Sequence, residues 1–132
     1  MYTFLMRKIY LITLFLFLLI AIAFYNSNKK ETINYKIKNK TYKLLVADSS
    51  KEWERGLMGV KELNNTDGMI FLFPDKKPRV FWNKGTLLDL DVYWILDDKV
   101  IGRDFLPSTE NSKGVIYVSS PVPVNKVVEL IR

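Results

Sequence analysis

The sequence predicts an all-β fold, either a sandwich or a partly closed barrel, with one short helix, behind an N-terminal hydrophobic helix. Three observations lead to this prediction. About eight short segments carry the alternating or continuous apolar patterns of strands, whereas a single segment has helical spacing. Turn-forming residues separate these segments. Behind the hydrophobic segment about 100 residues remain, which is enough for one domain with one core.

The N-terminal segment, residues 9–25, reads IYLITLFLFLLIAIAFY and comes directly after Arg7 and Lys8. Its length lies at the short end of what spans a bilayer as a helix. We expect residues 1–27 to be a signal anchor that holds a domain at residues 28–132 at the cell membrane, outside the cytoplasm. Basic residues flank both ends of the segment, so charge does not favour this orientation. We infer it because a single N-terminal hydrophobic segment normally exports the domain that follows it. The alternative is secretion after cleavage near Ala23, because Ala21-Ile22-Ala23 has the small-x-small form of a cleavage site.

The remaining elements are predicted from periodicity and turn chemistry. A helix is expected to begin after Ser49, because Ser49 and Glu52 have capping-box spacing, and Trp53, Leu57 and Met58 form one apolar face over two or three turns. The run from Met69 is continuously apolar and is expected to be a core strand ended by Pro74. We expect the strands at residues 33–46, as a hairpin turning at Asn39-Lys40, and at residues 69–73, 79–83, 88–96, 99–105, 115–118 and 127–131.

Composition excludes several classes of site. The chain contains neither cysteine nor histidine, so disulfides, thiolate metal sites, a Ser-His-Asp triad and a histidine-bearing zinc site cannot be built. The formal charge is +6, but lysines and acids alternate beyond the hydrophobic segment, so we expect no nucleic-acid partner. Lys29 and Lys30 come shortly after the hydrophobic segment, where contact with lipid headgroups is easy. No cofactor or metal is expected.

The segment FWNKGTLLDLDVYWI, residues 81–95, concentrates polar chemistry within a strand-like pattern. Lys84 and Asp91 would face opposite sides of a regular strand, but the intervening Gly85 permits a bend that brings them together. With Thr86 as a hydroxyl neighbour and Trp82 as an aromatic wall, the pair would form a small site for a polar or anionic ligand. The segment thus predicts a non-catalytic binding or accessory module.

Other interpretations of the same residues stay open. Lys84 and Asp91 can be an ion pair that only fixes strand register. Asp89 and Asp91 share one strand face, and with Lys84 they could serve a carboxylate-dependent hydrolase or lyase, although one carboxylate could equally accept hydrogen bonds from the backbone. A structural module that binds another protein through a sheet edge is the third alternative.

Four motifs in fixed order carry a family resemblance: VADSSKEWERGLMGVKEL, DGMIFLFP, FWNKGTLLDLDVYWILDDKVI and YVSSPVPVNKVVEL. Together they resemble domain-of-unknown-function family 192 from about Val46 to Leu130. The resemblance implies a compact β-rich domain like a jelly roll or barrel, often behind a signal sequence, and implies no established reaction. The positions that match the family pattern are Arg55, Gly56, Leu57, Met58, Gly68, Met69, Phe71, Phe73, Phe81, Trp82, Lys84, Thr86, Leu90, Asp91, Tyr117, Ser120, Pro121 and Glu129.

The chain departs from this pattern in three places. Family members usually have Met and Asn where this chain has Asn83 and Gly85, and often proline at the position of Asp89. They usually continue well beyond the position of Ile131. Because Trp82, Lys84, Thr86 and Asp91 all stand at matching positions, the resemblance favours these four as the site and makes Asp89 a bystander.

Overall fold

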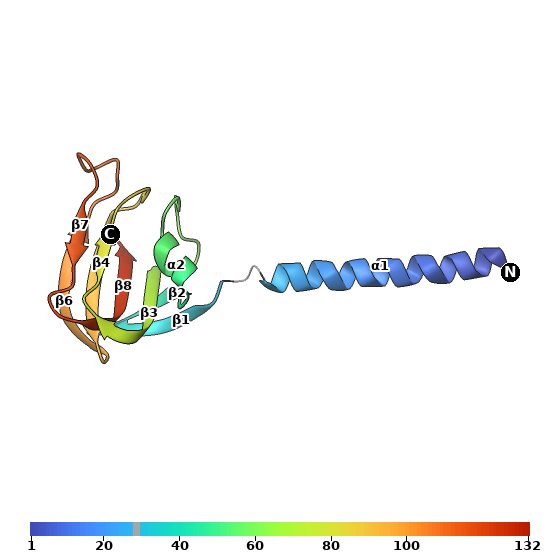
Figure 1. Ribbon diagram of the computed structural model, residues 1–132, viewed down its shortest axis with the longest axis horizontal. Coiled ribbons are helices and arrows are strands. Elements are labelled where there is room, and N and C mark those ends of the chain that lie inside the picture. Colours follow the sequence, from blue (N-terminus) through green and yellow to red (C-terminus); the bar gives the residue numbers. More distant parts are fainter. Residues whose placement is uncertain (28–29) are drawn as a thin grey trace. The chain divides into compact units, whose positions relative to one another are not determined.

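The computed structural model describes residues 1–27 and 30–132 and separates into two compact units, Met1–Lys30 and Glu31–Arg132 (Figure 1). The first unit is the helix α1 (Tyr2–Ser27). Its residues Tyr2–Asn26 have a mean hydropathy of 2.3, and none of the most apolar part is buried inside the protein. At 1.5 Å per residue, this helix is longer than the roughly 30 Å hydrocarbon core of a bilayer. By length and composition it can cross a membrane, and an N-terminal signal sequence has the same length and composition.

The second unit confirms the mostly β prediction. Six strands form one sheet in the order β1-β2-β3-β8-β5-β6, and β4 pairs with β7 in a separate two-stranded ribbon. All pairings are antiparallel except that between β2 and β3, which are connected by a segment containing α2. The elements are β1 (Thr32–Ile37), β2 (Lys40–Ala47), α2 (Ser50–Arg55), β3 (Gly68–Lys77), β4 (Val80–Trp82), β5 (Leu90–Leu96), β6 (Lys99–Leu106), β7 (Tyr117–Ser119) and β8 (Val124–Ile131).

The sheet does not close, because β1 and β6 remain as its two edges. One face of the sheet packs against α2, the loop after it and the β4–β7 ribbon. Phe71, Val92 and Trp94 are buried on this inner face, and Phe81 of the ribbon packs against them. Phe81 lies edge-on to both Phe71 and Trp94, with ring centroids 4.8 and 5.7 Å apart. The architecture is therefore a sandwich of one large sheet and one small ribbon.

The continuous apolar run at the start of β3 is explained by burial on both of its faces. Met69 and Phe71 belong to the inner cluster, whereas Ile70 belongs to a second buried cluster with Leu44 and Val128. Alternate residues of a strand point to opposite faces, so a strand buried on both sides has no polar alternation. This confirms the expectation that the run from Met69 is a core strand.

Several predicted boundaries differ from the structure by a few residues, and two of the differences have a clear physical reason. The strand β3 continues through Pro74 to Lys77 instead of ending at Pro74. The register of β3 against β8 shifts between Leu72 and Lys77, and such a bulge accommodates a residue that has no N–H for the ladder. The helix α2 ends at Arg55, because Gly56 adopts a positive φ of 48°, so Leu57 and Met58 lie in the following loop. The helix does begin after Ser49, whose hydroxyl donates to Glu52 at 2.8 Å.

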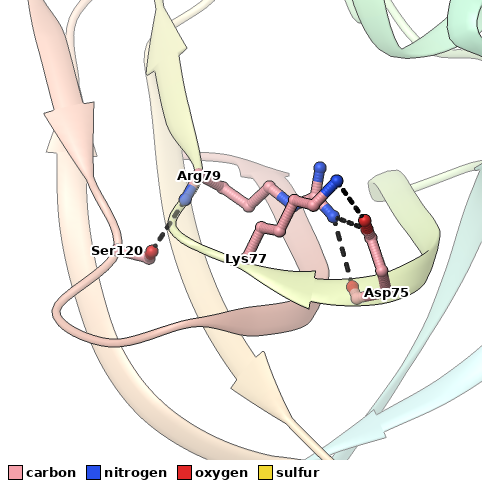
Figure 2. A network of polar contacts seen from close by, with 4 residues as sticks. All are labelled: Asp75, Lys77, Arg79 and Ser120. Atoms are coloured by element: carbon pink, nitrogen blue, oxygen red, sulfur yellow. Dashed lines mark hydrogen bonds and ion pairs between the residues drawn. The ribbon is translucent and has the colours of Figure 1, made fainter.

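A polar network holds the chain where β3 turns toward β4 (Figure 2). Asp75 forms ion pairs with both Lys77 and Arg79, and Arg79 Nη2 also donates to the carbonyl oxygen of Asp75 at 3.2 Å. On the other side, the backbone N–H of Arg79 donates to the hydroxyl of Ser120 at 2.9 Å. The backbone N–H of Ser120 donates to the carbonyl of Arg79, also at 2.9 Å. These bonds fix Arg79 at the start of the ribbon.

Candidate ligand-binding cleft

The segment that concentrates the polar residues is interrupted by a turn and is not one bent strand. The strand β4 ends at Trp82, and Lys84 and Gly85 form a turn in which Gly85 has a φ of 67°. A Cβ on Gly85 would lie 2.8 Å from Cγ of Met58, so this position also permits close contact with the loop after α2. That loop is tied to the turn, because the N–H of Gly59 donates to the carbonyl of Gly85 at 2.9 Å.

The side chain of Asn83, directly before the turn, is completely buried and holds the turn in place. Its side-chain Nδ2 donates to the carbonyl of Pro107 and to the hydroxyl of Ser112, both at 2.8 Å. Its Oδ1 accepts a hydrogen bond from the N–H of Ile116 at 2.8 Å. All polar atoms of this amide are therefore used to hold the loop before β7, and the direction of the turn is fixed.

A cleft of about 430 Å³ lies beside this turn. One wall consists of α2 and its following loop, between Ser50 and Met58, and the other consists of residues between Pro78 and Thr86. Phe71 and Phe73 of β3 and Glu129 of β8 complete the lining. Its volume falls within the range of sites that bind small molecules.

Three of the four residues expected at the site line this cleft: Trp82, Lys84 and Thr86. Asp91 is not among the lining residues. Its neighbours Leu90 and Val92 are buried in the inner cluster, so Asp91 lies on the opposite face of the sheet, where its carboxylate pairs with Arg103 at 2.6 Å. The bend at Gly85 therefore brings Lys84 to the cleft without joining it to Asp91.

Asp89 is held by other residues and lies outside the cleft. Its carboxylate accepts hydrogen bonds from the N–H of Ser108 at 2.7 Å and from the side-chain amide of Asn111 at 3.0 and 3.1 Å. The bond from Ser108, followed by that from Asn111, keeps the pKa of the Asp89 carboxyl below its usual value. Because Asp91 is paired with Arg103 instead, the two carboxylates do not act on a shared group. Among residues 1–27 and 30–132, no three His, Cys, Asp or Glu side chains group as metal ligands.

Glu129 is the functional candidate that the reasoning from residue patterns missed. It is 4% exposed and lies in β8 between Met69 of β3 and Val92 of β5, both of which are buried apolar residues. Its Oε2 has no hydrogen-bond partner among the described residues. Burial alone raises the pKa of this carboxyl from 4.5 to about 8, so it is mostly uncharged at pH 7. The sequence does contain an indication of this buried acid, because the apolar segment VVELI includes a single acidic residue.

Arg79 lines the cleft and carries the second unpaired polar atom. Its guanidinium lies 3.8 Å from the ring centroid of Phe73, and Nη2 is held by Asp75. Its Nε is buried and has no partner. Within the described part of the chain, Arg79 Nε and Glu129 Oε2 are the two buried side-chain polar atoms left without a hydrogen bond, and both belong to residues that line the cleft.

Gly56 lies close to Glu129 in the lining of the cleft. A Cβ at this position would lie 3.4 Å from Cζ of Phe71 and 3.9 Å from Oε2 of Glu129. Any larger side chain would thus occupy the space in front of the carboxyl. The positive φ of Gly56 also disfavours every other residue type. The glycine therefore lets the end of α2 approach Phe71 and the Glu129 carboxyl closely.

The β unit matches a family model over residues 32–132, that of DUF192, described as uncharacterized ACR. The chain belongs to this family. A DUF192 domain thus makes up nearly the whole second unit, and the resemblance expected from the four motifs is confirmed. No curated protein has significant similarity to the chain.

Two solved structures are similar to this DUF192 chain. A protein from Sinorhizobium meliloti 1021, with a proposed role as a transcription regulator, is 27% identical and gives a TM-score of 0.59 over 76% of this chain and 78% of its own. A protein of unknown function from Novosphingobium aromaticivorans is 22% identical, with a TM-score of 0.63 over 77% of this chain and 73% of its own. The second likeness supports the fold alone.

Proposed function

We propose that this DUF192 protein is a membrane-anchored, extracytoplasmic binding protein that holds a small polar ligand in its cleft without chemical conversion. The observation that carries the proposal is that the two unpaired buried side-chain polar atoms of the described residues, Arg79 Nε and Glu129 Oε2, belong to residues that line one cleft. Each buried polar atom without a partner costs about 1–3 kcal/mol. A ligand that supplies both partners recovers this free energy on binding.

The walls of the cleft fit such a ligand. Trp82 and Phe73 contribute aromatic side chains to the lining, and Lys84 adds a positive charge at the turn. Aromatic walls with a few converging polar groups are typical of small-molecule sites. The carboxylates of the alternative hydrolase, Asp89 and Asp91, are engaged outside the cleft by Ser108 and Arg103. These contacts favour binding over carboxylate-dependent catalysis.

A ligand screen on the full chain in detergent micelles tests the binding proposal. Thermal unfolding would be followed with sugars, amino acids and small organic anions added singly. We expect at least one compound to raise the melting temperature, because a ligand at 100 times its Kd stabilises by about 2.7 kcal/mol. Trp82→Ala and Lys84→Ala should each lower the affinity for that compound at least about tenfold, because the first removes a wall contact and the second a charge.

The control for this screen is Lys99→Ala, which removes an exposed lysine at the start of β6, away from the cleft. It should leave the affinity unchanged. If the wild type and both cleft variants, Trp82→Ala and Lys84→Ala, bind the compound with equal affinity, the ligand lies elsewhere and the proposal is contradicted. A screen in which no compound shifts the melting temperature would contradict it as well.

We infer further that α1 remains in the mature protein and anchors the DUF192 domain outside the cytoplasm. The length and hydropathy of α1 support this inference. In spheroplasts, added protease should degrade the domain, and the intact protein should have the mass of the full chain and sediment with membranes. A domain that is degraded only after the membrane is permeabilised, or a soluble product that begins just after Ala23, would contradict this topology.

A further inference from the structure

We propose that the cleft binds a small zwitterion, with the ligand's ammonium group on the carboxylate of Glu129 and its anionic oxygen on Nε of Arg79. This inference rests on the proposed binding function and names the chemical class of its ligand. It uses two groups from different elements of the cleft lining, one in β8 and one just before β4.

The strands on either side of Glu129 place apolar residues beside it. No ion pair among the described residues involves Glu129, and its strand neighbours Met69 and Val92 are apolar. A buried carboxylate is stable only beside a cation, so the free protein holds this group in its neutral form. Glutamine would bind a neutral hydroxyl equally well. What a carboxyl adds to an amide is the capacity to ionise against an incoming cation.

The Arg79 side carries an excess of positive charge. Two cations, Lys77 and Arg79, share the single carboxylate of Asp75, as Figure 2 shows. Lys77, and after it Arg79, holds the pKa of the Asp75 carboxyl below its usual value, so the network carries one net positive charge. Nη2 is occupied by Asp75, whereas Nε–H is buried and unpaired. An anionic oxygen would complete this donor with a charge-assisted hydrogen bond.

Other charged groups around Glu129 come from three elements. Glu54 and Arg55 line the cleft from α2, and Lys84 lines it from the turn after β4. On the side of β5 and β6, Asp104 is engaged by Nε1 of Trp94 at 2.6 Å. The acid and base on α2 offset each other, whereas Lys84 adds positive charge on the same wall as Arg79. The ionised groups of the cleft therefore give an excess of positive charge that favours an anionic group of the ligand, and Glu129 is the group that can ionise beside the ligand's ammonium.

Binding of a zwitterion must release a proton. Glu129 enters the reaction as a neutral acid and ends as a carboxylate against the ligand's ammonium, so its proton passes to the buffer. At pH 7 most molecules carry this proton, and about one proton per site should be released. At pH 9 the carboxyl is mostly ionised before binding, and the release should nearly vanish.

The experiment is titration calorimetry on the full chain in detergent, in pairs of buffers that differ in ionisation enthalpy. The zwitterions are leucine, phenylalanine and phosphoethanolamine, and the controls are their deaminated counterparts 4-methylpentanoate, 3-phenylpropanoate and ethyl phosphate. We expect at least one zwitterion to bind with release of about one proton at pH 7 and little at pH 9. Its deaminated counterpart should bind at least about tenfold more weakly.

Glu129→Gln keeps the size and neutrality of the side chain and should fold, but it should lose the proton release and at least about tenfold in affinity for the zwitterion. The matched control is Glu110→Gln in the exposed loop before β7, which should change neither quantity. Binding without proton release, equal affinity in Glu129→Gln, or no binding by any of the three zwitterions would overturn the proposal.

These outcomes separate the two proposals. The cleft could instead bind a neutral sugar or a simple anion, with an affinity that Trp82→Ala lowers and Glu129→Gln leaves unchanged. That result would support the binding function and contradict the zwitterion proposal. Failure of every compound in the wider screen would overturn both.

Discussion

Replacing Glu129 by glutamine is expected to stabilise the fold by about 4 kcal/mol at pH 8 and to have little effect below pH 4.5. In the unfolded chain this carboxyl ionises near 4.5, whereas burial raises its pKa to about 8 in the folded protein. Between these values the folded state binds more protons than the unfolded state. The stability that the neutral carboxyl contributes is therefore fully present below pH 4.5 and is lost as the pH rises toward 8.

The measurement is chemical denaturation of wild type and Glu129→Gln in detergent at pH 4, 5, 6, 7 and 8. The difference in the free energy of unfolding should grow by about 1.4 kcal/mol per pH unit over most of this range. Glu110→Gln, whose side chain is exposed, is the control and should give a nearly constant difference. A difference for Glu129→Gln that is also independent of pH would show that Glu129 is ionised in the fold.

Replacing Gly68 by alanine is expected to destabilise the β unit by more than about 3 kcal/mol. A Cβ at this position would lie 1.9 Å from the carbonyl oxygen of Glu129 and 3.0 Å from Cα of Leu130. Both are backbone atoms of β8, the strand to which β3 is paired at Gly68. They cannot turn away as a side chain would, so the two central strands must separate.

Thermal unfolding of the full chain in detergent measures this effect, with Gly59→Ala as the control. A Cβ on Gly59 meets no atom within 4 Å, although its φ of 72° strains any other residue. That strain should cost about 1–3 kcal/mol. Since the clash at Gly68 involves backbone, Gly68→Ala should lower the melting temperature more than Gly59→Ala does. An equal or smaller loss would contradict the close β3–β8 approach that positions Glu129.

Much of the fold could be predicted from local patterns. Alternation predicted the hairpin of β1 and β2, and a continuous apolar run predicted the doubly buried strand at Met69–Phe73. Pro74 misled the prediction of a strand end, because a bulge formed with a distant strand absorbs the missing N–H. Such a bulge depends on β8, which begins only at Val124, far along the chain from Pro74, so no local pattern reveals it.

The site was predictable only in part for the same reason. The chain does turn at Gly85, and Trp82, Lys84 and Thr86 line the cleft beside it, but the turn does not bring Lys84 and Asp91 together as expected. The partner of Asp91 was not predictable, because a hairpin with β6 brings Arg103 to it. Glu129 matches the family pattern but was not proposed as a site residue, because only its burial distinguishes it from an ordinary solvated acid at a sheet edge.

The most direct test of the account is a titration of the Glu129 carboxyl itself. The ¹³C chemical shift of its side-chain carboxyl would be followed from pH 4 to pH 10 in the full chain, with Glu129→Gln used to assign the signal. We predict a midpoint near 8 in the free protein and a strong downward displacement of that midpoint when a zwitterion is bound. A midpoint near 4.5 in the free protein would contradict a buried, unpaired carboxyl in the lining of the cleft, and the binding proposals built on it.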